Sequence, residues 1–372
     1  MATAEQYRNQ ASSLSYRNQA FIGGKYVPAA SGETFDCVSP IDGAVLTSVA
    51  SCDKEDVDAA VKAARAAFES GVWSEMDPRD RKQALLRFAA AIADHREELA
   101  LLETLDMGKP ITFAQSVDID GVVSTVQWYA EAIDKIYDEI APTGRDAIGM
   151  ITREPLGVVA TVVPWNFPLL MGAWKFGPAL AAGNSIIMKP AEQSPLSALR
   201  LAEIAAEAGI PDGVFNVVPG FGEKAGQALG LHMDVDMVAF TGSTEVGKYF
   251  LKYAADSNMK HISLECGGKT PNIVFNDCKD LDAAAMGSGM GVFFNTGQVC
   301  VASTRLLVQE DIHDEFVEKV KKVAETMQPG DPLDPATLMG SMVDVDQMER
   351  VKSYIEIGEK EGASLVQGGK QV

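Results

Sequence analysis

Between Gly157 and Leu264, short β-branched runs alternate five times with helical stretches. The predicted strands cover Val158–Val163, Ser185–Met188, Val214–Val218, Met237–Thr241 and Ile262–Leu264, and the helices between them cover Leu170–Ala182, Ser194–Ala208, Glu223–Leu229 and Glu245–Ala255. This alternation is typical of a parallel sheet covered by helices on both faces. We therefore predict an α/β fold with a doubly wound, Rossmann-like sheet of the kind that binds nucleotides.

The chain before this region has a less regular pattern. β-branched residues predict strands at Phe21–Pro28 and Val45–Ala50, and apolar spacing predicts the helices that follow, namely Asp53–Glu69, Pro78–Asp94, Glu97–Leu105 and Asp118–Tyr137. Residues 1–20, in which Tyr-Arg-Asn-Gln-Ala occurs twice, are expected to form a loosely held polar arm. Residues 139–154 indicate two extended segments around a turn. They form either an arm that pairs with another subunit or an ordinary surface hairpin.

Polar or glycine-rich segments follow all five predicted strands. These are Pro164-Trp-Asn-Phe-Pro168, Lys189-Pro-Ala-Glu192, Pro219-Gly-Phe-Gly222, Thr241-Gly-Ser-Thr-Glu-Val-Gly247 and Leu264-Glu-Cys-Gly-Gly-Lys269. In an open parallel sheet the ligand binds beyond the carboxyl ends of the strands. Small residues that lead into a helix leave backbone N–H groups free for phosphate. One glycine-rich turn is weak evidence, because ordinary turns need glycine too, but five such strand ends in one sheet predict a binding site.

A single cysteine, Cys300, follows the apolar helical pattern that ends at Phe294-Asn-Thr-Gly297. A buried structural thiol is the simplest interpretation of this residue alone. The chain has five cysteines and no Cys-x-x-Cys pair, so neither a disulfide framework nor a zinc site is indicated. Its four histidines form no pair at metal-ligand spacing, and we predict no metal. A reducing cytoplasm fits this cysteine content.

Charge and hydropathy limit which macromolecules and membranes the protein can be expected to bind or enter. The formal net charge of −20 disfavours nucleic acid and anionic membranes. The N-terminus lacks the basic and apolar segments of a secretory signal. The apolar stretch Leu156–Trp174 is interrupted by Pro164, Asn166 and Pro168, so we interpret it as a buried strand and a loop, not a membrane span.

Four of these motifs together resemble the aldehyde dehydrogenase superfamily, from about Phe21 to the last residue. They are Pro164-Trp-Asn-Phe-Pro168, Phe240-Thr-Gly-Ser-Thr-Glu-Val-Gly247, Leu264-Glu-Cys-Gly-Gly-Lys269 and Gly297-Gln-Val-Cys300. Trp128–Asp134 and Asp256–Lys260 are most similar to the branch that oxidises aminoaldehydes from polyamine (putrescine) breakdown, such as γ-glutamyl-γ-aminobutyraldehyde dehydrogenase. General-substrate and betaine aldehyde dehydrogenases are the alternatives within the family.

The resemblance implies a catalytic role for specific residues. Cys300 would be the nucleophile that forms a thiohemiacetal and then a thioester. The amide of Asn166 and the backbone N–H of Cys300 would stabilise the oxyanion. Glu265 would activate water to release the acid. Lys175 is at a position assigned to a proton relay with Glu265, although a salt-bridged helix residue is an equal alternative.

The resemblance also implies an NAD site and a substrate channel. Lys189 and Glu192 would hold the adenosine ribose, and the Glu192 carboxylate would repel a 2′-phosphate, so NAD is expected over NADP. Ser243 would meet the pyrophosphate. The other cofactor-binding candidates are Trp165, Gly222, Gly242, Val246 and Gly267. The substrate-channel candidates are Phe167, Leu170, Trp174 and Val301.

The expected organisation follows the family. Residues 1–125 and 155–265 would form the NAD-binding domain, 126–154 a helix end and an oligomerisation hairpin, and 266–372 an α/β catalytic domain. A homodimer or homotetramer is expected of the full-length form. Family members continue past Val372 with a Glu-x-Phe-Gly-Pro segment that this sequence lacks, so we expect a truncated form. The remaining alternatives are a CoA-acylating dehydrogenase, a thiol esterase, and an NAD-binding form without catalysis. Glu265 argues against CoA acylation, because it favours water as the acyl acceptor.

Overall fold

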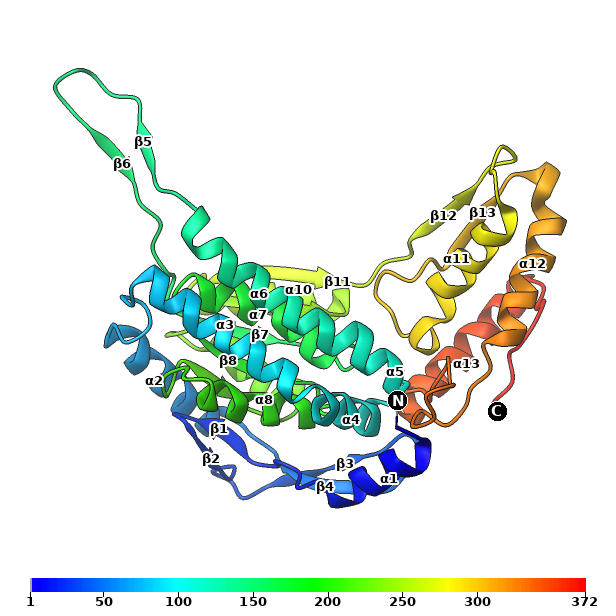
Figure 1. Ribbon diagram of the computed structural model, residues 1–372, viewed down its shortest axis with the longest axis horizontal. Helices are drawn as coiled ribbons and strands as arrows, with labels where there is room; N and C mark the ends of the chain where they lie inside the picture. The colour runs from blue at the N-terminus through cyan, green and yellow to red at the C-terminus, as the bar shows by residue number, and fades with distance from the viewer. Residues whose placement is uncertain (1) are drawn as a thin grey trace.

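The computed structural model describes residues 2–372 and contains one large sheet (Figure 1). The strand order in this seven-stranded sheet is β11-β10-β7-β8-β9-β1-β2. The five predicted strands form its parallel part, as β7 (Val158–Val162), β8 (Ser185–Lys189), β9 (Phe215–Val217), β10 (Met237–Gly242) and β11 (His261–Cys266). The doubly wound parallel sheet predicted from the sequence is therefore confirmed.

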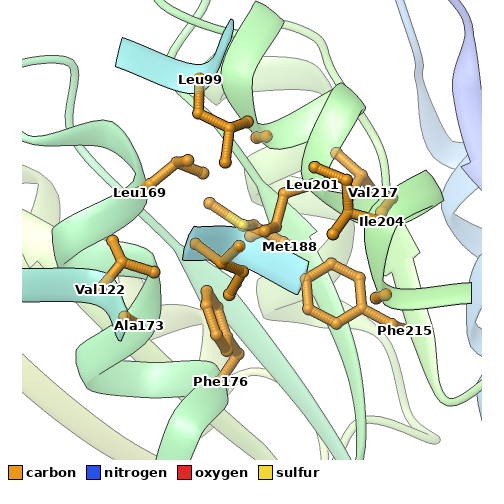
Figure 2. Packing of buried hydrophobic residues seen from close by; sticks show 14 of the residues in the cluster. Leu99, Val122, Leu169, Ala173, Phe176, Met188, Leu201, Ile204, Phe215 and Val217 are labelled. Atoms are coloured by element: carbon orange, nitrogen blue, oxygen red, sulfur yellow. The ribbon is translucent and has the colours of Figure 1, made fainter. Parts of the chain in front are cut away.

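Helices cover both faces of the sheet. One face carries α2 (Lys54–Glu69), α9 (Gln227–Leu231) and α10 (Thr244–Ala255), and side chains such as Val61, Leu229 and Phe250 join one apolar cluster there. The other face carries α3 (Pro78–Asp94), α4 (Arg96–Met107), α6 (Asp120–Ala132), α7 (Pro168–Ala181) and α8 (Leu196–Glu207). Figure 2 shows this second cluster, with Met188 of β8 among side chains from the strands and helices around it.

The predicted strand Phe21–Pro28 is two strands. β1 (Ala20–Ile22) and β2 (Lys25–Val27) form an antiparallel hairpin around Gly23 and Gly24, both at positive φ. Glycine adopts this conformation without steric cost, so the pair permits a two-residue turn. β1 also pairs antiparallel with β9, which makes the sheet mixed. A second hairpin consists of β3 (Thr34–Val38) and β4 (Val45–Ala50).

The prediction of a loose N-terminal arm was wrong for the described residues; Met1 lies outside them. Ala4–Ser13 form α1, which begins with a capping box in which Thr3 and Gln6 satisfy each other's backbone N–H groups. Tyr7 is buried and accepts a hydrogen bond from Gln115. The polar composition gave no signal for this helix, in which Tyr7 is the one buried residue.

Two predicted helices have irregular ends. The helix expected at Asp118–Tyr137 starts earlier, because α5 (Ile111–Phe113) and a π-helix, η1 (Ala114–Ile119), lead into α6, and it ends in the 3₁₀ turn η2 (Ile133–Lys135). The helix expected at Glu223–Leu229 begins as a second π-helix, η3 (Gly222–Gly226), before α9. π-Turns occur often at functional sites.

Two parts of the chain lie outside the large sheet. β5 (Glu139–Ala141) and β6 (Gly149–Ile151) pair antiparallel in a hairpin that projects from the body (Figure 1). After β11, the parallel pair β12 (Pro271–Val274) and β13 (Arg305–Val308) packs with the helices of the C-terminal part. The elements there are α11 (Leu281–Phe293), η4 (Phe294–Gly297), η5 (Glu310–Ile312), α12 (His313–Thr326) and α13 (Val345–Lys360).

Candidate active site

The loop between β7 and α7 presents Asn166 at the carboxyl end of the sheet. Pro164 and Pro168 restrict the backbone on either side, and Pro168 starts α7, where its missing N–H costs little. The Asn166 side-chain Nδ2 donates to the backbone carbonyl of Gln298 at 2.8 Å. This bond joins the loop to the segment before Cys300, 132 positions away in the sequence.

The segment before Cys300 has an unusual backbone. Asn295 (φ 51°) and Thr296 (φ 58°) both adopt the left-handed region, and Gly297 follows at φ 75°. Consecutive non-glycine residues in this region are sterically costly, so the surrounding contacts must hold them. Buried Asn295 supplies such contacts, because its Nδ2 donates to the carbonyls of Asn166 at 3.1 Å and Gln298 at 3.2 Å.

Cys300 follows this turn and is partly exposed. Its backbone carbonyl accepts from the N–H of Gly268 at 3.2 Å, and Gly268 lies three residues after Glu265. The backbone therefore brings the end of β11 next to the cysteine loop. Cys37 and Cys52 differ from Cys300 because both are buried, and burial raises the pKa of each thiol above its usual range. An accessible thiol in a polar setting is the reactive kind.

Lys175 of α7 is close enough to both predicted reactive groups, Glu265 and Cys300, for their charges to affect its pKa. It is buried, and its Nζ donates to the Thr241 hydroxyl at 2.5 Å. Thr241 is aligned with Glu265 across β10 and β11. Burial lowers the pKa of Lys175 from 10.5 to about 8, and the negative charges of Glu265 and Cys300 offset part of this shift. The alternative interpretation, in which Lys175 forms a salt bridge on its helix, does not fit, because the hydrogen-bond partner of its Nζ is the neutral hydroxyl of Thr241.

Lys189 and Glu192 lie together at the end of β8, as predicted. Buried Lys189 donates from Nζ to the carbonyl of Pro190 at 2.8 Å and to Glu192 at 3.5 Å. Burial lowers the pKa of Lys189, and Glu192 partly counteracts that effect. A half-exposed carboxylate fixed beside an ammonium is suited to accept hydrogen bonds from ribose hydroxyls.

The other predicted cofactor residues surround the same edge. Ser243 caps α10 by accepting from the N–H of Val246 at 3.2 Å, and both residues are exposed. The other N–H groups of a first helical turn have no intrahelical partner, so an anion could bind there. A Cβ added to Gly222 or Gly267 would meet no atom within 4 Å. This open space lets a ligand approach the backbone, and the site fits a dinucleotide. Gly242 and Trp165 are half-buried beside these positions.

The four substrate-channel candidates have different environments. Trp174 and Val301 are exposed, at 51% and 68%, while Leu170 is half-buried. Phe167 is buried, with its ring against Lys109 and Phe294. The buried ring of Phe167 thus anchors the loop to Lys109 and Phe294. Its place in a substrate channel stays a prediction.

Several residues that contact this site were missed from the sequence. Lys109, Asp118, Glu103 and Asn295 are all buried near the Asn166 loop. Helical spacing predicts only that Glu103 and Asp118 lie on helices. Lys109 in Met107-Gly-Lys-Pro110 lies at a helix end, where a cation is ordinarily interpreted as a solvated cap. Its burial is a tertiary effect with no local signal.

Three further properties concern residues 2–372. No group of three or more His, Cys, Asp or Glu side chains there is arranged to hold a metal ion. None of the described helices combines the length and apolarity that a membrane crossing requires. A cavity of about 1170 Å³ adjoins the cofactor edge at Glu192 and Phe221 and continues to α13.

Comparisons with known proteins agree with this geometry. The family model described as "Aldehyde dehydrogenase family" matches residues 26–372. The NADP/NAD-dependent aldehyde dehydrogenase PuuC of Escherichia coli K12 is 54% identical over 362 residues, which are 97% of this chain and 73% of that protein. Two solved structures are similarly close. An indole-3-acetaldehyde dehydrogenase in complex with NAD+ has a TM-score of 0.99 at 54% identity, covering 100% of this chain and 75% of that one.

The second structure is the γ-glutamyl-γ-aminobutyraldehyde dehydrogenase of Burkholderia cenocepacia J2315. Its TM-score is 0.98 at 56% identity, and the alignment covers 100% of this chain and 75% of that chain. The present chain thus spans about three quarters of the length of these relatives. The family model matches nearly the whole chain, and the sequence identities with these relatives exceed 50%. The chain belongs to the aldehyde dehydrogenase family.

Proposed function

We propose that the protein oxidises an aldehyde to the carboxylic acid with NAD, through a covalent intermediate on Cys300. The observation that supports it is the meeting of three groups at one edge of the sheet. The Asn166 carboxamide is bonded to the loop before Cys300, and the Cys300 carbonyl is bonded to the segment after Glu265. Lys175 is near enough to Glu265 and Cys300 for their charges to act on its pKa.

In this proposal each side chain has one task. The Cys300 thiolate adds to the aldehyde carbonyl, and the developing oxyanion accepts hydrogen bonds from Asn166 Nδ2 and the Cys300 N–H. When NAD+ is bound, its nicotinamide supplies the acceptor for the hydride that leaves the thiohemiacetal carbon. Glu265 then takes a proton from the water that attacks the thioester, and Lys175 receives or returns that proton. The products are the acid and the free Cys300 thiol.

The cofactor residues are proposed from position and chemistry. Lys189 and Glu192 would hold the adenosine ribose, and Ser243 and the start of α10 the pyrophosphate. Gly222 and Gly267 would leave room for the approach of the pyrophosphate, and Gly242 would lie at the same edge. Trp165 and Val246 would line the same edge. The complex of the indole-3-acetaldehyde dehydrogenase with NAD+ supports NAD as the cofactor.

The proposed substrate class is an aminoaldehyde of polyamine breakdown, such as γ-glutamyl-γ-aminobutyraldehyde. The support is the 56% identity with an enzyme that carries this substrate in its name. Leu170, Trp174 and Val301 would contact the aldehyde, with Phe167 beneath them. A panel of γ-glutamylated aldehydes, free aminoaldehydes, indole-3-acetaldehyde and plain alkyl aldehydes tests this. The highest kcat/KM should belong to the first group, and a preference for an alkyl or indole aldehyde would overturn it.

We also propose how the chain is divided. Residues 1–125 and 155–265 would form the cofactor-binding domain, 126–154 the oligomerisation arm, and 266–372 the catalytic domain. The arm carries exposed apolar side chains (Ile140, Ile148, Met150 and Ile151), which supports pairing with a second copy in a homodimer or homotetramer. The cytoplasm is the proposed location, supported by five cysteines of which none forms a disulfide in residues 2–372.

The central test is NADH formation from aldehyde and NAD by the protein and by its Cys300→Ala and Cys300→Ser variants. Both variants are expected to lose at least about a thousandfold in rate while binding NAD normally in a titration. Identification of the product separates the reaction classes, because an acyl-CoA formed in the presence of CoA would indicate the acylating class. Persistent aldehyde oxidation by Cys300→Ala would contradict the assignment of the nucleophile.

A further inference from the structure

A buried lysine lies directly under the Asn166 loop. Lys109 and its counter-ion Asp118 form an ion pair in which both side chains are completely buried. The Lys109 Nζ also donates to the backbone carbonyl of Asn166 at 2.9 Å, and it lies 3.7 Å from the ring centroid of Phe167. One ammonium group thus contacts two consecutive residues of the loop and a carboxylate from η1.

The Asn166 carbonyl has a second donor. Asn295 Nδ2 bonds to the same oxygen at 3.1 Å. A carbonyl oxygen has two lone pairs, so Lys109 and Asn295 together fill its acceptor capacity. The peptide group after Asn166 cannot rotate without breaking both bonds. This fixes the backbone from which the Asn166 carboxamide extends.

The start of α7 is held from the same buried cluster. Glu103 Oε1 accepts from the N–H of Leu169 at 3.0 Å and from the Ser197 hydroxyl at 3.3 Å. Burial, and to a lesser degree the neighbouring Asp118, raises the pKa of Glu103 well above its usual range, which favours its neutral form. Lys109 and Asp118 form the ion pair of this cluster. The cluster contacts the loop at Asn166 and again at Leu169.

Stability alone does not require this ion pair. Burying two charges costs desolvation energy that their attraction only partly returns, and apolar side chains of similar volume are often equally stable. An apolar pair, however, cannot donate to the Asn166 carbonyl. The position of the ammonium between a carboxylate and that carbonyl therefore indicates a role in orientation.

We propose that Lys109, held by Asp118, is a positioning residue that sets the orientation of the Asn166 carboxamide. This inference rests on the proposed function, because it matters only if Asn166 stabilises the oxyanion. Lys109 touches neither substrate nor cofactor in this proposal. Its removal lets the loop shift, and a displacement of about 1 Å at a reacting group can cost on the order of a hundredfold in rate.

The test compares the double variant Lys109→Met/Asp118→Leu with Asn166→Ala and with all three substitutions combined. The double variant removes both charges together and leaves no unpaired buried ion. Lys260→Met is the matched control, because buried Lys260 also donates to a backbone carbonyl, that of Gly230 at 2.6 Å, but at a different place. Rapid-mixing measurement of the first NADH turnover gives the rate, and thermal unfolding verifies the fold.

The double variant is expected to slow the first turnover by about tenfold to a hundredfold. It should have no further effect when Asn166 is already replaced by alanine, because both changes act through one carboxamide. Alkylation of Cys300 by iodoacetamide should keep its rate, and Lys260→Met should stay within about twofold of the unmodified protein. Lys109→Arg with Asp118 retained should restore part of the lost rate.

Independent, multiplying effects of the double variant and Asn166→Ala would overturn the proposal, as would an unchanged first turnover. If the double variant does not fold, Lys109→Arg supplies the same comparison, once with Asn166 intact and once together with Asn166→Ala. Failure of the proposed function is a different result, because Asn166→Ala alone would then leave the first turnover unchanged. The two ideas can therefore fail separately.

Discussion

The side-chain amide of Asn166 donates a hydrogen bond of 2.8 Å to the backbone carbonyl of Gln298, two residues before Cys300. This bond joins the loop after β7 to the loop that carries the predicted nucleophile. An amide nitrogen has two hydrogens, so one remains free after this contact. The same group can therefore hold the cysteine loop and still donate to an oxyanion.

The first prediction concerns Asn295, which fixes this arrangement from the other side. Asn295→Ala removes two buried hydrogen bonds and leaves a Cβ-bearing residue at φ 51°. We expect a loss of about 2–4 kcal/mol in the free energy of unfolding and a fall of at least about tenfold in kcat. Urea unfolding and steady-state NADH formation measure the two effects.

Asn295→Gly is the matched control, because glycine adopts positive φ freely but cannot bridge the two carbonyls. It should regain the part of the stability that comes from the backbone and none of the activity. Equal stability of the alanine and glycine variants would show that the left-handed backbone costs little at this position. Full activity in either variant would contradict the role given to the side chain.

The sheet could be predicted from the sequence because its signals are local. β-Branched strands, apolar helix faces and glycine-rich strand ends each occupy a few consecutive residues, and β7 to β11 lie within a few residues of their expected bounds. Asn166, Glu265 and Cys300 were singled out because each lies in a short motif. The hairpin of β5 and β6 was predicted for the same reason.

What could not be predicted depends on contacts between distant parts of the chain. Lys109 meets Asn166 across 57 positions, and Asn295 meets it across 129. Neither contact produces a pattern in the spacing of neighbouring residues along the sequence. The helix α1 was missed because its polar sequence resembles a solvated arm, whereas its capping box and the burial of Tyr7 stabilise it. The antiparallel pairing of β1 with β9 is likewise non-local.

Cofactor choice gives the second prediction. Glu192→Gln removes the negative charge expected to repel a 2′-phosphate while keeping the size of the side chain. The KM for NADP should fall by about tenfold relative to that for NAD, since an effect of about 1.4 kcal/mol corresponds to a factor of ten. Glu223→Gln is the control, because that exposed carboxylate lies on the neighbouring η3. An unchanged NADP/NAD ratio in Glu192→Gln would remove Glu192 from the ribose site.

The arm gives the third prediction. Ile148 and Met150 are 80% and 74% exposed on the β5–β6 hairpin. If they pair with a second copy, Ile148→Asp/Met150→Asp places two charges in an apolar interface and should shift the protein to a smaller species in sedimentation velocity. The melting temperature of the separated chains should change little, because both side chains are exposed within one chain. An unaltered sedimentation coefficient would favour the ordinary surface hairpin.

The fourth prediction follows from Lys175. Burial favours its neutral form and lowers its pKa from 10.5 to about 8. Above pH 8 its amine can accept the proton released when Glu265 activates water, so thioester hydrolysis should accelerate as pH rises through about 8. Lys175→Arg keeps a permanent cation and should lose this acceleration. Single-turnover hydrolysis of the acyl intermediate from about pH 6.5 to 9.5 measures the profile.

The same pKa predicts a change in stability with a definite sign. Between pH 8 and 10.5 the unfolded chain binds more protons at Lys175 than the folded chain does, because its unfolded pKa is the higher one. The free energy of unfolding contributed by this group therefore rises with pH in that window. Lys175→Met should reduce that rise, by about 1 kcal/mol or more at about pH 9.5. Identical pH slopes in urea unfolding of the two proteins would mean that Lys175 keeps its proton, and a base role for it would then be untenable.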